Sequence, residues 1–196
     1  MTDLTDVEYD SNTLQAMAAL IGETIEFIEE DGIGVELTLC SKKQLYFFPE
    51  ELWVSSKTLD EVGYAWLKRA ITLEPTPKSP DYPYYKDVFR GIAQVIDVRL
   101  VDTVAVFDEP IHPQRFHEGV GCWFINPDQM TDLDPAKKMR HATAEIGFLI
   151  ITNLFVVSLM TYDNGFSVGD YDNLLLESIA VFSSRYPQYR HRSIMA

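Results

Sequence analysis

The side chains best suited to chemistry gather in one stretch of the chain, DEPIHPQRFHEGVGC, residues 108–122. A histidine that is oriented by a neighbouring carboxylate can act as a general base. His112, His117 and Glu118 also offer nitrogen and oxygen ligands of the kind that hold zinc or iron. The prolines in this stretch favour an irregular loop, whereas metal ligands usually sit on rigid elements. We therefore expect a polar surface loop, with those three residues as the metal candidates if an ion is bound.

Elsewhere the sequence matches no catalytic or cofactor motif. There is no phosphate-binding glycine loop, no GxSxG or HExxH motif and no CxxC pair. The acidic stretch DNGFSVGDYDN lacks the ligand spacing of a calcium loop. Two cysteines, Cys40 and Cys122, cannot form a disulfide framework, and the acidic start MTDLTDVEYD does not resemble a signal peptide. We expect a non-enzymatic protein without a cofactor, located in the cytoplasm or in an assembled particle.

Charge is distributed unevenly along the chain, whose formal net charge is -14. Residues 1–62 contain fourteen Asp and Glu against three Lys, whereas the segment RYPQYRHRS, residues 185–193, contains three Arg and no acid. Nucleic-acid phosphates would be repelled, so we expect no direct nucleic-acid binding. The polarity favours a basic protein partner or end-to-end self-association. The predicted partner-binding residues are Glu23, Glu26, Glu29, Glu30, Arg185, Arg190 and Arg192.

The N-terminal half of the sequence predicts an α-β-β-α arrangement. The expected elements are a helix over 11–31, strands over 35–40 and 45–48, a helix over 58–73, and a proline-rich connector over 74–85. Apolar residues at helical spacing indicate the first helix, with Gly32 as its stop. Strict alternation indicates the first strand, and the polar turn 41–44 indicates the second as its returning partner. The capping-box spacing of Thr58 and Glu61 indicates the second helix. The four predicted partner-binding glutamates then share the outer face of the first helix.

The C-terminal half predicts a helix, a second hairpin and two further helices within the same single domain, residues 1–196. The expected elements are a helix over 85–97, strands over 99–107 and 119–126 joined by a long loop, a helix over 135–163, and a last helix over 170–186. Asp134 followed by Pro135 is typical of a helix start, and Asp170 can cap the last helix.

The uncharged run from Ile146 to Tyr162 allows three interpretations. A membrane span would place Thr152 and Asn153 at its centre, where hydrocarbon tolerates polar groups least. Two strands, 148–151 and 155–160, turning at Thr152-Asn153, would suit the many β-branched and aromatic residues. We favour an apolar helix at the centre of the core, because the preceding segment also reads as helical and no membrane association is expected.

These elements predict an α+β fold: a mainly antiparallel sheet of two hairpins, helices on one face, and one long apolar central helix. The favoured function is a non-catalytic assembly subunit of a homo-oligomer or larger particle, such as a virion connector or tail-completion component. One alternative is an acidic inhibitor, immunity protein or secretion-type chaperone that masks a basic partner. The order helix–hairpin–helix–hairpin–helix is similar to that of type III secretion chaperones. A metal-dependent enzyme using the His112–Cys122 loop is the other alternative.

Overall fold

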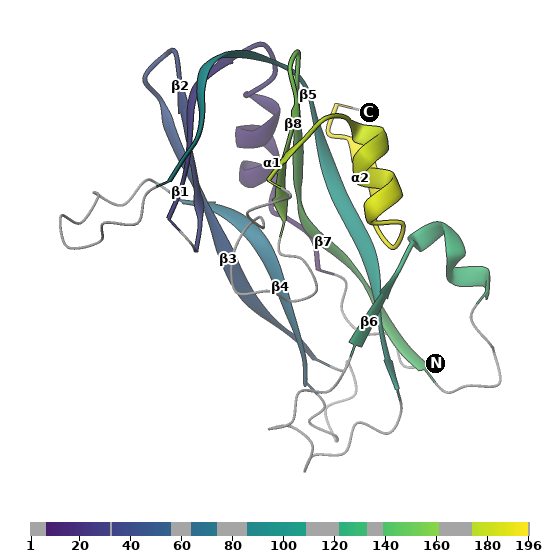
Figure 1. The fold of residues 1–196 in the computed structure, drawn as a ribbon. Helices are drawn as coiled ribbons and strands as arrows, with labels where there is room; N and C mark the ends of the chain where they lie inside the picture. Colours follow the sequence, from purple (N-terminus) through teal and green to yellow (C-terminus); the bar gives the residue numbers. More distant parts are fainter. Residues whose placement is uncertain are drawn as a thin grey trace.

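The protein is built mostly of antiparallel strands, as a computed structural model shows (Figure 1). The structure describes residues 7–31, 33–55, 64–73, 86–108, 122–132, 139–160 and 174–195. The elements are α1 (Ser11–Ala18), β1 (Thr24–Glu30), β2 (Val35–Leu39), β3 (Gln44–Ser55), β4 (Tyr64–Leu73), β5 (Lys86–Asp108), β6 (Cys122–Ile125), the 3-10 helix η2 (Pro127–Asp132), β7 (Met139–Thr152), β8 (Val156–Met160), β9 (Leu175–Leu176), α2 (Ile179–Arg185) and β10 (Arg190–Ser193). The expectation of a long central helix in an α+β fold is therefore wrong.

The long strand β5 lies in the middle of the strand order and joins two groups of strands. In the described residues the order is β4-β3-β2-β1-β5-β7-β8-β9. One edge of β5 pairs with β7. Its other edge is shared in succession by β1, β10 and β6. A four-residue strand near the C-terminus thus completes the edge of β5 between two strands from other parts of the chain.

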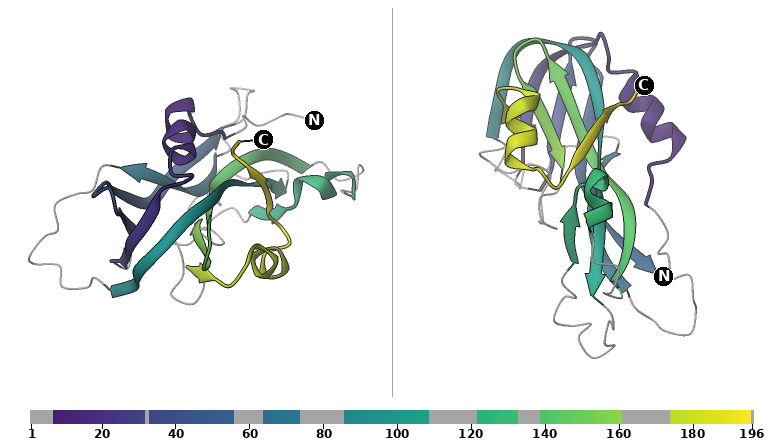
Figure 2. Two further views of the ribbon diagram at one scale, coloured as in Figure 1. Left: turned by 90° about the horizontal axis from the view of Figure 1, so that it is seen from above. Right: turned by 90° about the vertical axis from the view of Figure 1, so that its right-hand side faces the viewer.

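Two clusters of buried apolar side chains stabilise this arrangement. One lies among α1, the first strands and β5, with Met17 of α1 fully buried. The other lies under α2, whose Phe182 is fully buried against β5, β7 and β8. The two α-helices lie on opposite sides of the strands (Figure 2). The expectation that helices cover one face of the sheet is thus also wrong.

Besides the long central helix, two other predicted helices are strands in the structure. The segment 58–73 contributes β4, and the segment 85–97 forms the first half of β5. Both carry apolar residues at helical spacing, but they also contain β-branched and aromatic residues that favour strands. Pairing of β4 with β3 and of β5 with β1 satisfies their backbone groups along their length. Long-range pairing therefore overrides the local helical pattern.

The two terminal predicted helices are much shorter than expected. The first ends at Ala18, with Asp10 as its cap, and the chain then turns through Gly22 at φ 89 into β1. Glycine adopts this left-handed conformation without steric cost. The last helix is reduced to α2, capped by Ser178. The element order on which the similarity to secretion chaperones rested is therefore absent.

As far as Met160, the apolar run forms the end of β7 and all of β8, so the two-strand interpretation is confirmed. The Thr152 hydroxyl accepts the backbone N–H of Phe155 at 2.9 Å and fixes the turn between the strands. All five residues of β8 are buried, which explains why no polar residue alternates along it. No helix in the described part of the chain is long and apolar enough to span a membrane.

The remaining strand predictions are confirmed. The predicted hairpin of 35–40 and 45–48 appears as β2 and β3, although β3 extends to Ser55. The predicted strand 99–107 lies within β5, and the strand 119–126 contains β6. These segments alternate strictly or end at turns, which are the patterns least open to a second interpretation.

Candidate protein-binding site

The four predicted partner-binding glutamates do not share a helix face. Glu26, Glu29 and Glu30 lie on β1, and Glu23 precedes it. Glu26 forms an ion pair with Lys42 at 2.7 Å, and Glu30 is buried with 5% of its surface exposed. These residues therefore lie along a paired strand, without the shared outward face that a helix would give them.

The predicted metal candidates His112, His117 and Glu118 lie outside the described residues. Cys122 begins β6, and Cys40 is an exposed free thiol. Within the described ranges no group of three or more His, Cys, Asp or Glu side chains is arranged to hold a metal ion.

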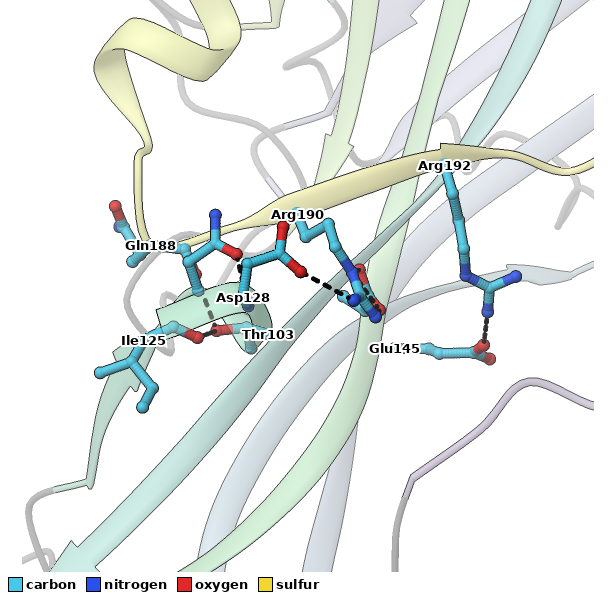
Figure 3. A network of polar contacts seen from close by, with 9 residues as sticks. Thr103, Ile125, Asp128, Glu145, Gln188, Arg190 and Arg192 are labelled. Atoms are coloured by element: carbon cyan, nitrogen blue, oxygen red, sulfur yellow. Dashed lines mark hydrogen bonds and ion pairs between the residues drawn. The ribbon is translucent and has the colours of Figure 1, made fainter. Parts of the chain in front are cut away.

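The basic segment near the C-terminus is part of the fold. Arg190 of β10 binds the carboxylate of Asp102 on β5, with Nη2 2.5 Å from Oδ2 and Nε 3.2 Å from Oδ1 (Figure 3). Its Nη1 also lies 3.2 Å from the exposed Asp128 of η2. Asp102 is 2% exposed, so the guanidinium compensates a nearly buried charge. The pKa of Arg190 is raised, first by its hydrogen bond to Asp102.

Arg192 makes a second contact of the same kind, two residues further along β10. Its Nη2 lies 2.7 Å from Oε1 of Glu145 on β7 (Figure 3). Oε2 of that glutamate accepts the backbone N–H of Tyr9 at 2.6 Å. Glu145 is 6% exposed. Burial raises the pKa of Glu145 despite these two contacts. We call Asp102 and Glu145, which are paired across β5 and β7, the carboxylate slot.

The connector that leads into β10 is also anchored. The Thr103 hydroxyl lies 3.1 Å from the carbonyl oxygen of Gln188, and Asn126 Nδ2 donates to the carbonyl oxygen of Pro187 at 3.2 Å. Beyond β10, the backbone N–H of Ile194 donates to Val98 at 2.9 Å. The segment 187–194 is therefore held at both ends as well as through its arginines.

The opposite side of β10 contains a serine–histidine pair at hydrogen-bonding distance. His191 Nε2 lies 3.0 Å from Oγ of Ser183 on α2, and Nδ1 lies 3.1 Å from Nη1 of Arg99. Arg99 also contacts Asp97 at 3.0 Å. Nucleophilic catalysis would require His191 Nε2 to accept the serine proton.

The proton directions in this pair are opposite to those of a catalytic pair. An arginine can only donate, so Nδ1 of His191 must accept, and Nε2 must carry the proton. The Ser183 hydroxyl then accepts from Nε2 and donates to the carbonyl oxygen of Ile179, 3.1 Å away. Burial and the neighbouring Arg99 lower the pKa of His191, which favours this neutral form. The pair is thus arranged to tie α2 to β10.

An exposed apolar surface lies on the first half of β5. Ile92 and Ile96 are 63% and 57% exposed, and they alternate with the buried Ala93 and Val95. Leu154, in the turn between β7 and β8, is 57% exposed. Its neighbour Asn153 donates its backbone N–H to Gln94, between the two isoleucines, at 3.0 Å. We call Ile92, Gln94, Ile96 and Leu154 the outer face of β5.

The charged residues beside this outer face occur as ion pairs. Arg90 lies 3.0 Å from Asp87 and stacks over the ring of Phe27 at 5.0 Å from its centroid. On the neighbouring strand Glu26 pairs with Lys42. This part of a strongly acidic molecule therefore presents both signs of charge around an apolar centre.

Sequence reasoning identified the arginines of β10 but missed their partners and the outer face of β5. Asp102 is 88 residues from Arg190, and Glu145 is 47 residues from Arg192. An acid within a mainly apolar strand, as in RLVDTVAVF, is the one local indication that a buried partner is needed. The predicted helix over 85–97 gave no indication that Ile92 and Ile96 are exposed.

Comparisons of the chain with protein-family models, with curated proteins and with solved structures find no match. The function must therefore be argued from the geometry above.

Proposed function

We propose that this chain is a non-catalytic assembly subunit that associates with copies of itself, in a homo-oligomer or in a larger particle of which a virion connector is one kind. The outer face of β5 is the observation that supports this proposal. Three large apolar side chains, each more than half exposed, lie around Gln94. Exposed apolar surfaces of this type are typical of protein-interaction sites.

The charges around the outer face favour a second copy as the partner. A chain of net charge -14 repels its own copies over most approaches. The ion pairs Glu26–Lys42 and Asp87–Arg90 are each neutral, so two copies can meet here without that repulsion. In a twofold contact the cation of one copy can also face the anion of the other.

Substitution of the two isoleucines tests this proposal. We expect Ile92→Lys together with Ile96→Lys to reduce the solution mass, measured by sedimentation equilibrium. The added charges lower the net negative charge, so increased repulsion would not explain dissociation. Ile33→Lys is the matched control, because Ile33 is also an exposed isoleucine, at 48%, but lies in the turn between β1 and β2. An unchanged mass in the double variant, or a wild-type chain that is a monomer at every concentration, would contradict the proposal.

The acidic composition supports a second candidate, an inhibitor, immunity protein or chaperone that masks a basic partner. Residues 1–62 contain fourteen acids against three lysines, and such a surface accelerates association with a cationic partner. This candidate predicts a complex of one chain with a basic protein, formed at a rate that falls steeply with salt. Binding by the Ile92→Lys/Ile96→Lys variant at the wild-type rate would favour it over self-association.

A further inference from the structure

We propose that the carboxylate slot also binds β10 of a second copy, so that two copies exchange their C-terminal strands. This inference rests on the proposed self-association and names a second contact for it. The predicted role of Arg190 and Arg192 was to reach a neighbouring molecule. If these arginines bind a neighbouring molecule, their partners in the structure indicate that they bind Asp102 and Glu145 of that neighbour.

The slot requires a strand with two basic side chains. Asp102 and Glu145 are directly opposite each other in the β5–β7 ladder and are 2% and 6% exposed. Adjacent buried carboxylates are strongly disfavoured unless both charges are compensated. A strand without cations at the right spacing would pair with the edge of β5 but leave these charges uncompensated.

The residues 190–193 contain all that the slot requires. Arg190 and Arg192 are two residues apart, so their side chains leave the strand on one side. They reach the two carboxylates at 2.5 and 2.7 Å. The backbone pairs with β5 from Arg190 opposite Asp102 to Ser193 opposite Arg99. Each contact is non-covalent, so the same strand from a second copy would make every one of them.

Exchange is favoured over simple release of the strand. A released strand leaves Asp102 and Glu145 unpaired, whereas replacement by an identical strand restores both pairs. A second copy is also the natural source of the strand, because a molecule of net charge -14 attracts a strand with two Arg and no acid.

Exchange of β10 requires the chain to change direction between α2 and β10. The turn Tyr186–Tyr189 joins them, and Phe182 anchors α2 in its own core cluster. A short connection between two elements can act as the hinge when one of them is exchanged between copies. The helix can thus stay with its own chain while the strand passes to the other.

A disulfide across β5 and β10 can record which chain supplies the strand. The Ile194 N–H bonds to Val98, so the adjoining pair Ser193 and Arg99 is of the closer, non-hydrogen-bonded kind. The full chain would carry Arg99→Cys, Ser193→Cys and Cys40→Ser. It would be equilibrated in reduced form over a concentration series, oxidised and then denatured. We expect the fraction of disulfide-linked dimers with a 99–193 linkage, identified by peptide mapping, to rise with concentration. A 99–193 linkage found within single chains at every concentration would overturn the proposal.

Charge reversal provides a second test, in which Arg99 and Ser193 are not substituted. A chain with Glu145→Arg and a chain with Arg192→Glu each contain a like-charge contact, and each can lose it by exchanging strands with the other. We expect the two, refolded together, to form a heterodimer more resistant to urea than either alone. The single chain with both substitutions is the folding control. If that control folds while the mixture remains two separate species, exchange is excluded; if the control does not fold, the disulfide test decides.

Adding Ile92→Lys and Ile96→Lys to the disulfide test separates this inference from the proposed function. Reduction of the non-covalent oligomer to a dimer in which 99–193 linkages between chains still form would support both contacts independently. An oligomer that survives the lysines while 99–193 dimers still form would leave exchange as the contact and overturn the outer face. An oligomer lost with the lysines, with 99–193 linkages within chains alone, would overturn exchange and keep the outer face.

Discussion

Two regions of β5 differ in how their side chains are used. Along Arg99–Asp102 the strand is covered by β10, and its charged groups meet opposite charges within 3.2 Å. Along Ile92–Ile96 the strand presents two isoleucines that are more than half exposed. The charged region is satisfied within one chain, whereas the apolar region still exposes surface that burial would stabilise. The sequence had suggested the opposite roles: charged residues for association with a partner, and apolar residues for the core.

The largest expected effect comes from removing the arginine over Asp102. Arg190→Ala leaves a nearly buried carboxylate unpaired, and such a change costs about 3 kcal/mol of unfolding free energy. Urea unfolding at neutral pH measures this loss. Arg90→Ala is the control, because its ion pair with Asp87 is exposed and should contribute less than about 1 kcal/mol. Equal losses of unfolding free energy in the two variants would show that the Arg190–Asp102 contact contributes no more stability than an exposed ion pair.

A pH-dependent effect is expected at Glu145. Its pKa in the folded protein is raised above the ordinary 4.5 by burial, so its stabilising contribution is complete below pH 4.5 and is lost as pH rises through the raised pKa. The unfolding free energy of the wild type should therefore fall, relative to Glu145→Gln, as pH increases from 4 toward neutral. Parallel profiles for the two proteins would contradict the burial of a charged carboxylate here.

His191 should show the opposite pH dependence on the other side of β10. Its pKa is lowered below the ordinary 6.5, so its contribution is complete above pH 6.5 and is lost as pH falls through the lowered pKa. Protonation would place an imidazolium against the Arg99 guanidinium. We expect His191→Gln to remove the loss of stability below pH 6.5 that the wild type shows. If the variant still loses stability below pH 6.5, another titrating group is responsible.

The smallest effect is expected at Ser183. Its hydroxyl links His191 to the carbonyl oxygen of Ile179, so Ser183→Ala should cost about 1 kcal/mol in thermal or urea unfolding. Because the proton on Nε2 points toward the serine, we also expect Ser183 to resist acylating reagents that react with activated serines. Rapid acylation at Ser183 would show that the pair works in the catalytic direction.

The sequence predicted best the strand whose two faces differ in polarity. Alternation located β2, and the polar turn that follows it located the start of β3. Alternation failed for β8, because all five of its residues are buried and four of them are apolar. For β4 and the first half of β5, the apolar spacing fitted a helix, and pairing with distant strands decided otherwise.

The candidate sites were predictable in part for a related reason. The arginines of β10 were visible as a local excess of charge, but their partners lie far away in the sequence. The outer face of β5 could not be located until the strand direction of Ile92 and Ile96 was known. Contacts within a segment follow from its own pattern, whereas contacts between segments require the topology.

The solution mass of the full chain at low and high salt, measured by light scattering, tests the central claim most directly. If apolar contact through the outer face of β5 drives association, a defined oligomer should persist unchanged at high salt, since salt screens charges and does not weaken apolar burial. A chain that is monomeric at every concentration would contradict the claim. An oligomer that dissociates with salt would contradict it as well, and would return association to the charged residues.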